Sequence, residues 1–135
     1  MKPVWIVDDD RSIRWVLEKT LSREGISFKS FASATEAISQ LEQGAEAPQV
    51  LLSDIRMPGQ SGLELLQEVK TRFPSVPVII MTAYSDLESA VAAFQGGAFE
   101  YLPKPFDVDQ AVELIQRAID ESVHQTGAHE EEGLV

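Results

Sequence analysis

Carboxylates follow two largely apolar runs of the sequence, at the point where each run ends. One run ends on Asp54, and the other, near the N-terminus, is followed by Asp8, Asp9 and Asp10. Carboxylates within ~4 Å of one another repel by about 4 kcal/mol per pair at an effective dielectric constant of roughly 20. A hard divalent cation such as Mg²⁺, which prefers oxygen ligands, removes that repulsion. These residues predict a magnesium site if the two runs end side by side. The alternative is that the three consecutive acids only cap the next helix.

Thr82 and Lys104 stand at the ends of two further strand-like segments, so both side chains could reach the same place as Asp54. Lys104 offers a point cation for a carboxylate or phosphoryl oxygen, and Thr82 offers a hydroxyl donor. Pro103 and Pro105 restrict the backbone on both sides of the lysine, which suggests a fixed position. The combination of acids, a threonine and a lysine at the ends of successive strands is a more specific sign of a functional site than any one of these residues.

Strand and helix patterns alternate five times along the chain. Apolar or alternating runs predict the strands, which are residues 3–7, 26–31, 50–54, 76–81 and 98–102. Five βα units imply an α/β fold: a doubly wound five-stranded parallel sheet with five helices on its two faces. The strand order cannot be read from the pattern alone, but the flavodoxin-like order 2-1-3-4-5 would put the first and third strands side by side at a switch point. That order gathers residues 8–10 and Asp54 in one crevice.

The fourth predicted helix is rich in small residues and ends at Gly96-Gly97. We expect Ala90, Val91 and Phe94 to face the core, with Ala93 on another face. Small residues and two glycines would give this helix few strong contacts, as in a mobile element. An ordinary alanine-rich helix is the alternative.

The composition is that of a single acidic domain. The chain has 135 residues, a usual domain size, and no cysteine, which suits a reducing compartment. Eleven basic against 22 acidic residues give a net charge of -11, which disfavours direct binding to nucleic acid. No apolar run approaches the ~20 residues of a membrane span. We therefore expect a cytoplasmic protein that contacts neither a membrane nor nucleic acid directly.

With these residues the chain resembles the receiver domain of two-component response regulators. The longer strings 12–18, 53–59 and 101–107 are more specifically similar to nitrogen-regulation regulators of the NtrC class. In that class a receiver precedes an ATPase domain and a DNA-binding domain, which this chain lacks. The resemblance implies a receiver with the flavodoxin-like strand order over residues 1–123 and a polar tail or start of a linker over 124–135. The motifs that carry it are Val7-Asp8-Asp9, Asp54 with Met57-Pro58-Gly59, Thr82-Ala83, and Tyr101 with Lys104-Pro105.

The resemblance implies a phosphoacceptor regulatory domain rather than an enzyme in its own right. Asp54 would take a phosphoryl group from a phosphohistidine of a sensor histidine kinase, assisted by Lys104 and Thr82. Thr82 and Tyr101 would act as the switch, which reshapes the surface around the fourth helix and fifth strand to control a transcription-activating output. A phosphorylation-dependent dimer is a further expectation.

Mg²⁺ is the cofactor that the resemblance implies. Asp9, Asp54 and the backbone carbonyl of Arg56 would bind the ion directly, and Asp8 would act through a water molecule. Because the family usually has a pair of acids rather than three, Asp10 is the alternative to Asp9. The Lys104–Pro105 peptide bond would be cis.

Two other functions share this fold class. A small phosphatase of the haloacid dehalogenase type would use Asp8 as its nucleophile, with Asp10 two residues later, but Ser12 is only a near match to that motif. A flavin or nucleotide carrier would need a glycine-rich phosphate loop after a strand, and the sequence has none.

Overall fold

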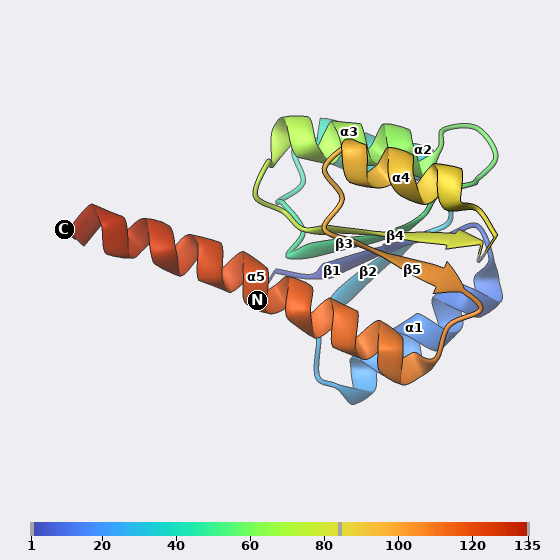
Figure 1. Ribbon diagram of the computed structural model, residues 1–135, viewed down its shortest axis with the longest axis horizontal. Coiled ribbons are helices and arrows are strands. Elements are labelled where there is room, and N and C mark those ends of the chain that lie inside the picture. Colours follow the sequence, from blue (N-terminus) through green and yellow to red (C-terminus); the bar gives the residue numbers. More distant parts are fainter. Residues whose placement is uncertain (1, 84, 135) are drawn as a thin grey trace.

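The computed structural model describes residues 2–83 and 85–134, with side chains up to residue 123. Five parallel strands form one sheet in the order β2-β1-β3-β4-β5, which confirms the flavodoxin-like prediction (Figure 1). Strands β1 and β3 pair directly, with Val7 opposite Ser53, so the predicted switch point lies between them. The strands are β1 (Val4–Val7), β2 (Phe28–Phe31), β3 (Val50–Asp54), β4 (Val78–Ala83) and β5 (Glu100–Lys104).

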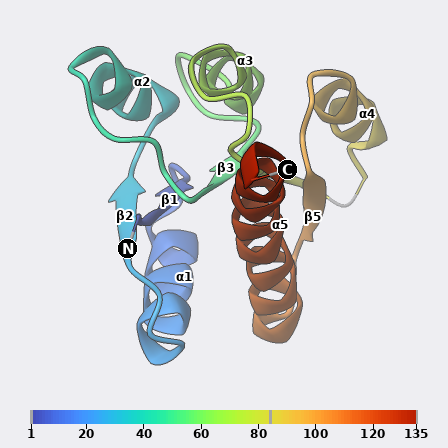
Figure 2. The same cartoon turned by 90° about the vertical axis from the view of Figure 1, so that its left-hand side faces the viewer.

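Five helices cover the two faces of the sheet. Figure 2 shows α1 and α5 on one face and α2, α3 and α4 on the other. Ser33 and Ser61 cap α2 and α3 by accepting a hydrogen bond from the backbone N–H three residues later, as their spacing predicts. The helices are α1 (Arg11–Arg23), α2 (Ala34–Glu42), α3 (Gly62–Arg72), α4 (Leu87–Gln95) and α5 (Val108–Leu134).

Apolar side chains fill both sides of the sheet because successive residues of a strand face opposite ways. Trp5 and Val7 pack among residues of α2 and α3, and Val4 and Ile6 pack among residues of α1 and α5. A central strand covered on both faces needs apolar residues at every position, which explains the continuous apolar runs. The buried acids Asp8 and Asp54 stand where the inner strands β1 and β3 end.

The last two strands lie about two residues later than the sequence pattern predicts. Val76 belongs to the turn before β4, because its N–H donates to the carbonyl of Phe73. Strand β5 continues through Pro103, which lies opposite Thr82. Proline has no backbone N–H to donate. It is tolerated here because β5 is an edge strand, and a backbone N–H on the open side of β5 would have no partner strand.

The prediction for the buried face of α4 was right for Ala90 and wrong for Val91, Phe94 and Ala93. Its buried residues are Ala90 and Ala93, whereas Val91 and Phe94 are 55% and 42% exposed. The helix packs over the edge of the sheet, where small side chains allow a close approach and larger ones remain outside. Leu87 is also exposed, so α4 presents an apolar outer face.

Helix α5 continues to Leu134, through the stretch predicted as a polar tail over 124–135. The side chains of that stretch lie outside the described residues, so the boundary at residue 123 stays a prediction. Within the part of the chain that the structure describes, every helix is too short or too polar to cross a membrane.

Candidate functional site

Two acids and a lysine from three strands meet at the carboxyl edge of the sheet. Asp8 directly follows β1, and Asp54 and Lys104 are the last residues of β3 and β5. Lys104 Nζ lies 2.8 Å from Asp8 Oδ2 and 3.3 Å from Asp54 Oδ1. The Lys104–Pro105 peptide bond is cis, as the resemblance implied. The strand order thus brings Asp8, Asp54 and Lys104 together in the predicted crevice.

Asp8, Asp9 and Asp54 could hold a divalent cation. One carboxylate oxygen of each lies within 4.8 Å of the others. Asp8 is fully buried and Asp54 is 8% exposed, while Asp9 is exposed at the mouth of the group. Three carboxylates at this separation match the oxygen donors that Mg²⁺ prefers, and the exposed side leaves room for its waters.

Asp10 does not join this group. Its carboxylate caps α1 by accepting hydrogen bonds from the backbone N–H groups of Ser12 (2.8 Å) and Ile13 (3.4 Å). The N–H of Asp10 donates to Asp8 Oδ1 at 2.8 Å. Of the two candidates for direct metal binding, the structure brings Asp9 to the site and uses Asp10 as a helix cap.

Burial makes the charges of this site costly. Burial and the charge of Asp8 raise the pKa of Asp54 to about 6, although Lys104 acts in the opposite direction. The pKa of Asp8 is also raised, mainly by burial, and its hydrogen bond from Lys104 offsets part of that effect. Burial alone would lower the pKa of Lys104, but the hydrogen bond and charge of Asp8 raise it. One lysine therefore compensates two clustered carboxylates only in part, and an added cation would stabilise them.

Thr82 lies near the carboxyl end of β4, and Tyr101 lies near the start of the neighbouring strand β5. Thr82 is 1% exposed, and Tyr101 lies opposite Ile80, two residues earlier on β4. The ring of Tyr101 meets the ring of Phe94 edge to face, with centroids 5.7 Å apart. Tyr101 therefore contacts α4 directly. The roles of Thr82 and Tyr101 in phosphoryl binding and switching stay predictions.

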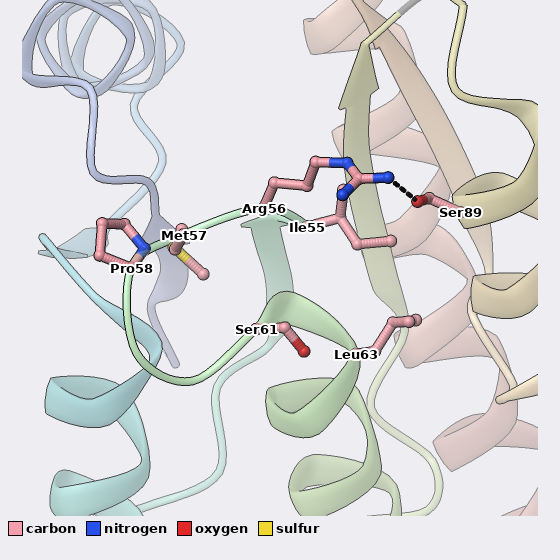
Figure 3. A pocket seen from close by; sticks show the side chains of 7 residues that line it. All are labelled: Ile55, Arg56, Met57, Pro58, Ser61, Leu63 and Ser89. Carbon is pink, nitrogen blue, oxygen red and sulfur yellow. Dashed lines mark hydrogen bonds between the residues drawn. The ribbon is translucent and has the colours of Figure 1, made fainter.

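Arg56 follows Asp54 in the loop before α3. Its exposed guanidinium pairs with Asp86, the cap of α4, at 2.8 Å. A cleft of about 460 Å³ separates this loop from α4 (Figure 3). The residues that line it are Ile55, Arg56, Met57, Pro58, Ser61, Leu63 and Ser89. The backbone carbonyl of Arg56 as a metal ligand stays a prediction.

Sequence reasoning missed two residues that support the site. A Cβ atom at Gly62 would collide with the backbone oxygen of Asp54 and lie 2.8 Å from Ile55 Cα, so glycine lets α3 start against the end of β3. The signal was a glycine directly after the capping serine. Arg14 Nη1 donates to the backbone oxygen of Asp8 at 2.6 Å. The sequence pattern does not distinguish this arginine from a solvated one.

Comparison with known proteins identifies a family over most of the chain. The family model described as response regulator receiver domain matches residues 4–116. The DNA-binding transcriptional regulator NtrC of Salmonella typhimurium is 58% identical over 116 residues, which cover 86% of this chain and 24% of that protein. The C4-dicarboxylate transport regulator DctD of Rhizobium meliloti is 41% identical over 115 residues, or 85% of this chain and 25% of that protein. The chain thus spans about a quarter of the length of these relatives.

Solved structures agree with this match. The apo receiver domain of nitrogen regulatory protein C superimposes with a TM-score of 0.76 at 56% identity, covering 88% of this chain and 94% of that one. A form of that receiver domain described as BeF3 activated superimposes with a TM-score of 0.74 at 56% identity, covering 89% of this chain and 97% of that one. NtrX of Brucella abortus superimposes with a TM-score of 0.87 at 29% identity, covering 95% of this chain and 29% of the NtrX chain.

Proposed function

This chain belongs to the response regulator receiver domain family, a family of regulatory domains, and on that premise we propose that Asp54 is its phosphoacceptor. The observation that carries the proposal is the pair of distances from Lys104 Nζ, 3.3 Å to Asp54 and 2.8 Å to Asp8. Phosphoryl transfer requires mainly positioning and charge neutralisation. The Lys104 ammonium group, fixed between two acids at an accessible sheet edge, supplies both the positioning and the charge neutralisation.

The proposed step transfers a phosphoryl group from a phosphohistidine to Asp54. A carboxylate oxygen of Asp54 attacks the phosphorus, a P–O bond forms, and the P–N bond to the imidazole breaks. The electron pair stays on that histidine nitrogen, and a proton carried by the other ring nitrogen leaves the imidazole neutral. Lys104 Nζ is close enough to donate a hydrogen bond to a phosphoryl oxygen on Asp54, and Thr82 is proposed to donate another. The product is a mixed anhydride on Asp54 and a neutral histidine on the donor.

The residues proposed to hold Mg²⁺ are Asp9, Asp54 and the carbonyl of Arg56, with Asp8 acting through water. When bound, Mg²⁺ would neutralise charge on the transferring group. Both oxygens of Asp8 already accept hydrogen bonds, from the N–H of Asp10 and from Lys104 Nζ. That arrangement favours an indirect role for Asp8.

The same hydrogen bonds argue against the phosphatase alternative. A nucleophile must present a free oxygen to its substrate, and Asp8 is fully buried with both oxygens engaged. Asp54 is the more accessible carboxylate and also lies at the end of a strand. The family match supports the same choice.

We propose that the signal leaves through Thr82, Tyr101 and α4. A phosphoryl group on Asp54 would draw the Thr82 hydroxyl toward the site, and Tyr101 would change rotamer in the vacated space. Because the Tyr101 ring packs on Phe94, such a change reaches the exposed apolar face of α4. Amide chemical shifts of residues 82 to 102 that do not change with a phosphoryl mimic would reject this route.

The partners are proposed from the relatives. A sensor histidine kinase in the cytoplasm would phosphorylate this domain, which would control an ATPase and DNA-binding output joined after residue 123. The stretch 124–135 would then be the start of the linker, and the phosphorylated domain would dimerise. The domain itself would assist its phosphorylation and dephosphorylation.

Labelling with acetyl phosphate and Mg²⁺ tests the proposal. We expect one phosphoryl group per chain, located at Asp54 by peptide mapping, and none at that position in Asp54→Asn. The matched control Asp120→Asn, an exposed acid of α5, should be labelled like the wild type. Labelling at Asp8, or labelling that survives EDTA, would contradict the proposed roles.

A further inference from the structure

We infer that the Arg56 side chain is a positioning residue for α4, which it joins to the loop after Asp54. Arg56 Nε lies 2.8 Å from Asp86 Oδ2, and Nη2 lies 3.5 Å from Ser89 Oγ. Figure 3 shows the guanidinium reaching across the cleft from its loop to α4. The inference rests on the proposed function, because the carbonyl of the same residue is proposed to bind Mg²⁺. One residue would then connect the ion, through its backbone, to a helix, through its side chain.

The loop end of this connection is firmly anchored. The N–H of Ile55 donates to the carbonyl of Met81 at 3.1 Å, and the N–H of Gly62 donates to the carbonyl of Ile55 at 2.9 Å. Arg56 is the first residue beyond these bonds. A change in its φ torsion, which turns the carbonyl and the side chain together about the N–Cα bond, therefore moves the side chain relative to a fixed base.

On the α4 side of the connection, the Asp86 carboxylate both caps the helix and binds Arg56. Asp86 Oδ1 accepts the N–H of Ser89 at 3.2 Å and so caps α4, while Asp86 Oδ2 accepts from Arg56 Nε. The Asp86 side chain is only 13% exposed, although that of Arg56 is 75% exposed. The planar guanidinium presents several donors in a fixed geometry, which suits simultaneous bonds to Asp86 and Ser89.

Besides the ring contact of Phe94 with Tyr101, α4 makes little apolar contact with the rest of the domain. The residues that the helix buries are Ala90 and Ala93, and a methyl group contributes little burial free energy. The larger Leu87 and Val91 are exposed. An exposed ion pair shifts an equilibrium by up to about fivefold, so for this lightly anchored helix the Arg56–Asp86 pair has a measurable influence.

Hydrogen exchange of the α4 amides, measured by NMR in EDTA, tests whether Arg56 holds the helix. The proteins are the wild type, Arg56→Ala, Asp86→Ser and the double variant; serine retains a capping oxygen but offers no carboxylate to Arg56. We expect α4 exchange about two- to fivefold faster in Arg56→Ala, with α3 unchanged. In the Asp86→Ser background, Arg56→Ala should have a smaller effect, because only the long bond from Arg56 Nη2 to Ser89 Oγ (3.5 Å) remains to be lost.

The matched control is Arg72→Ala, which removes an exposed ion pair with Glu68 (3.1 Å) on α3 and should leave α4 exchange unchanged. Equal α4 rates in the wild type and Arg56→Ala would overturn the inference. An Arg56→Ala effect that persists undiminished in the Asp86→Ser background would also overturn it, because the arginine would then act without the aspartate.

A Mg²⁺ titration tests the link to the site. In the wild type, Mg²⁺ should shift the amide resonances of residues 54–56 and change α4 exchange; in Asp86→Ser the shifts at 54–56 should remain and the α4 response should become smaller. The same α4 response in both proteins would refute the coupling. A titration without shifts at residues 54–56 would refute the metal role and its coupling, whereas the comparison in EDTA decides independently whether Arg56 holds α4.

Discussion

Replacing Asp54 by asparagine should stabilise the metal-free domain at neutral pH. Folding raises the pKa of this carboxyl from 3.8 to about 6, first through burial and then through the charge of Asp8. Each pKa unit corresponds to about 1.4 kcal/mol, so ionised Asp54 lowers the free energy of unfolding by about 3 kcal/mol. Asparagine has nearly the same shape and no charge, and therefore removes that cost.

The pH dependence has a defined sign. The folded state holds the Asp54 proton more tightly than the unfolded chain does, so stability falls as the pH rises from about 4 to about 6 and stays low above it. The advantage of Asp54→Asn should therefore be absent near pH 4 and complete at pH 7.5.

Urea unfolding followed by circular dichroism measures the effect, in EDTA at pH 4 and at pH 7.5. Mg²⁺ at 100 times its Kd should nearly cancel the difference at pH 7.5, because it adds about 2.7 kcal/mol to the wild type alone. Asp120→Asn, on exposed α5 surface, should change stability by no more than about 0.5 kcal/mol. Equal stability of wild type and Asp54→Asn in EDTA at pH 7.5, or an equal difference at both pH values, would refute the reasoning.

Four further substitutions test other parts of the site and fold. Lys104→Met leaves the fully buried Asp8 without its ion-pair partner and should cost about 3 kcal/mol in EDTA, with a smaller loss in Mg²⁺; a loss independent of Mg²⁺ would contradict the shared compensation. Gly62→Ala should cost about 1–3 kcal/mol by pushing α3 away from β3, and should slow labelling of Asp54 by acetyl phosphate. Val91→Ser should change stability by less than about 0.5 kcal/mol in urea unfolding, whereas Ala93→Val should cost about 1–3 kcal/mol; the reverse order would mean that α4 buries its other face.

The sheet and most of the site follow from local sequence patterns. Strands buried on both faces leave continuous apolar runs, and a polar residue that ends such a run must lie at the sheet edge. This logic located Asp8, Asp54 and Lys104 before any coordinates, and the structure joins them by ion pairs. The strand order needed the family resemblance in addition, because the pattern alone is compatible with several orders.

What the sequence could not predict depends on contacts between segments far apart in the chain. The buried face of α4 was predicted only in part, because hydrophobicity favours Val91 and Phe94 inside, whereas the approach of the helix to the sheet edge selects alanines. The bond from Arg14 to the Asp8 carbonyl and the pair of Arg56 with Asp86 leave no periodic signal. Asp10 was separated from Asp9 only by the geometry of the α1 cap.

The ion pair between Asp8 and Lys104 joins residues 96 positions apart. During synthesis on a ribosome Asp8 and Asp54 emerge long before Lys104. A nascent chain therefore carries both acids without the lysine that compensates them, and has no complete site. Only after the final strand has left the exit tunnel and docked at the sheet edge is the constellation complete. The chain therefore becomes competent to receive a signal as one of the last consequences of its own folding.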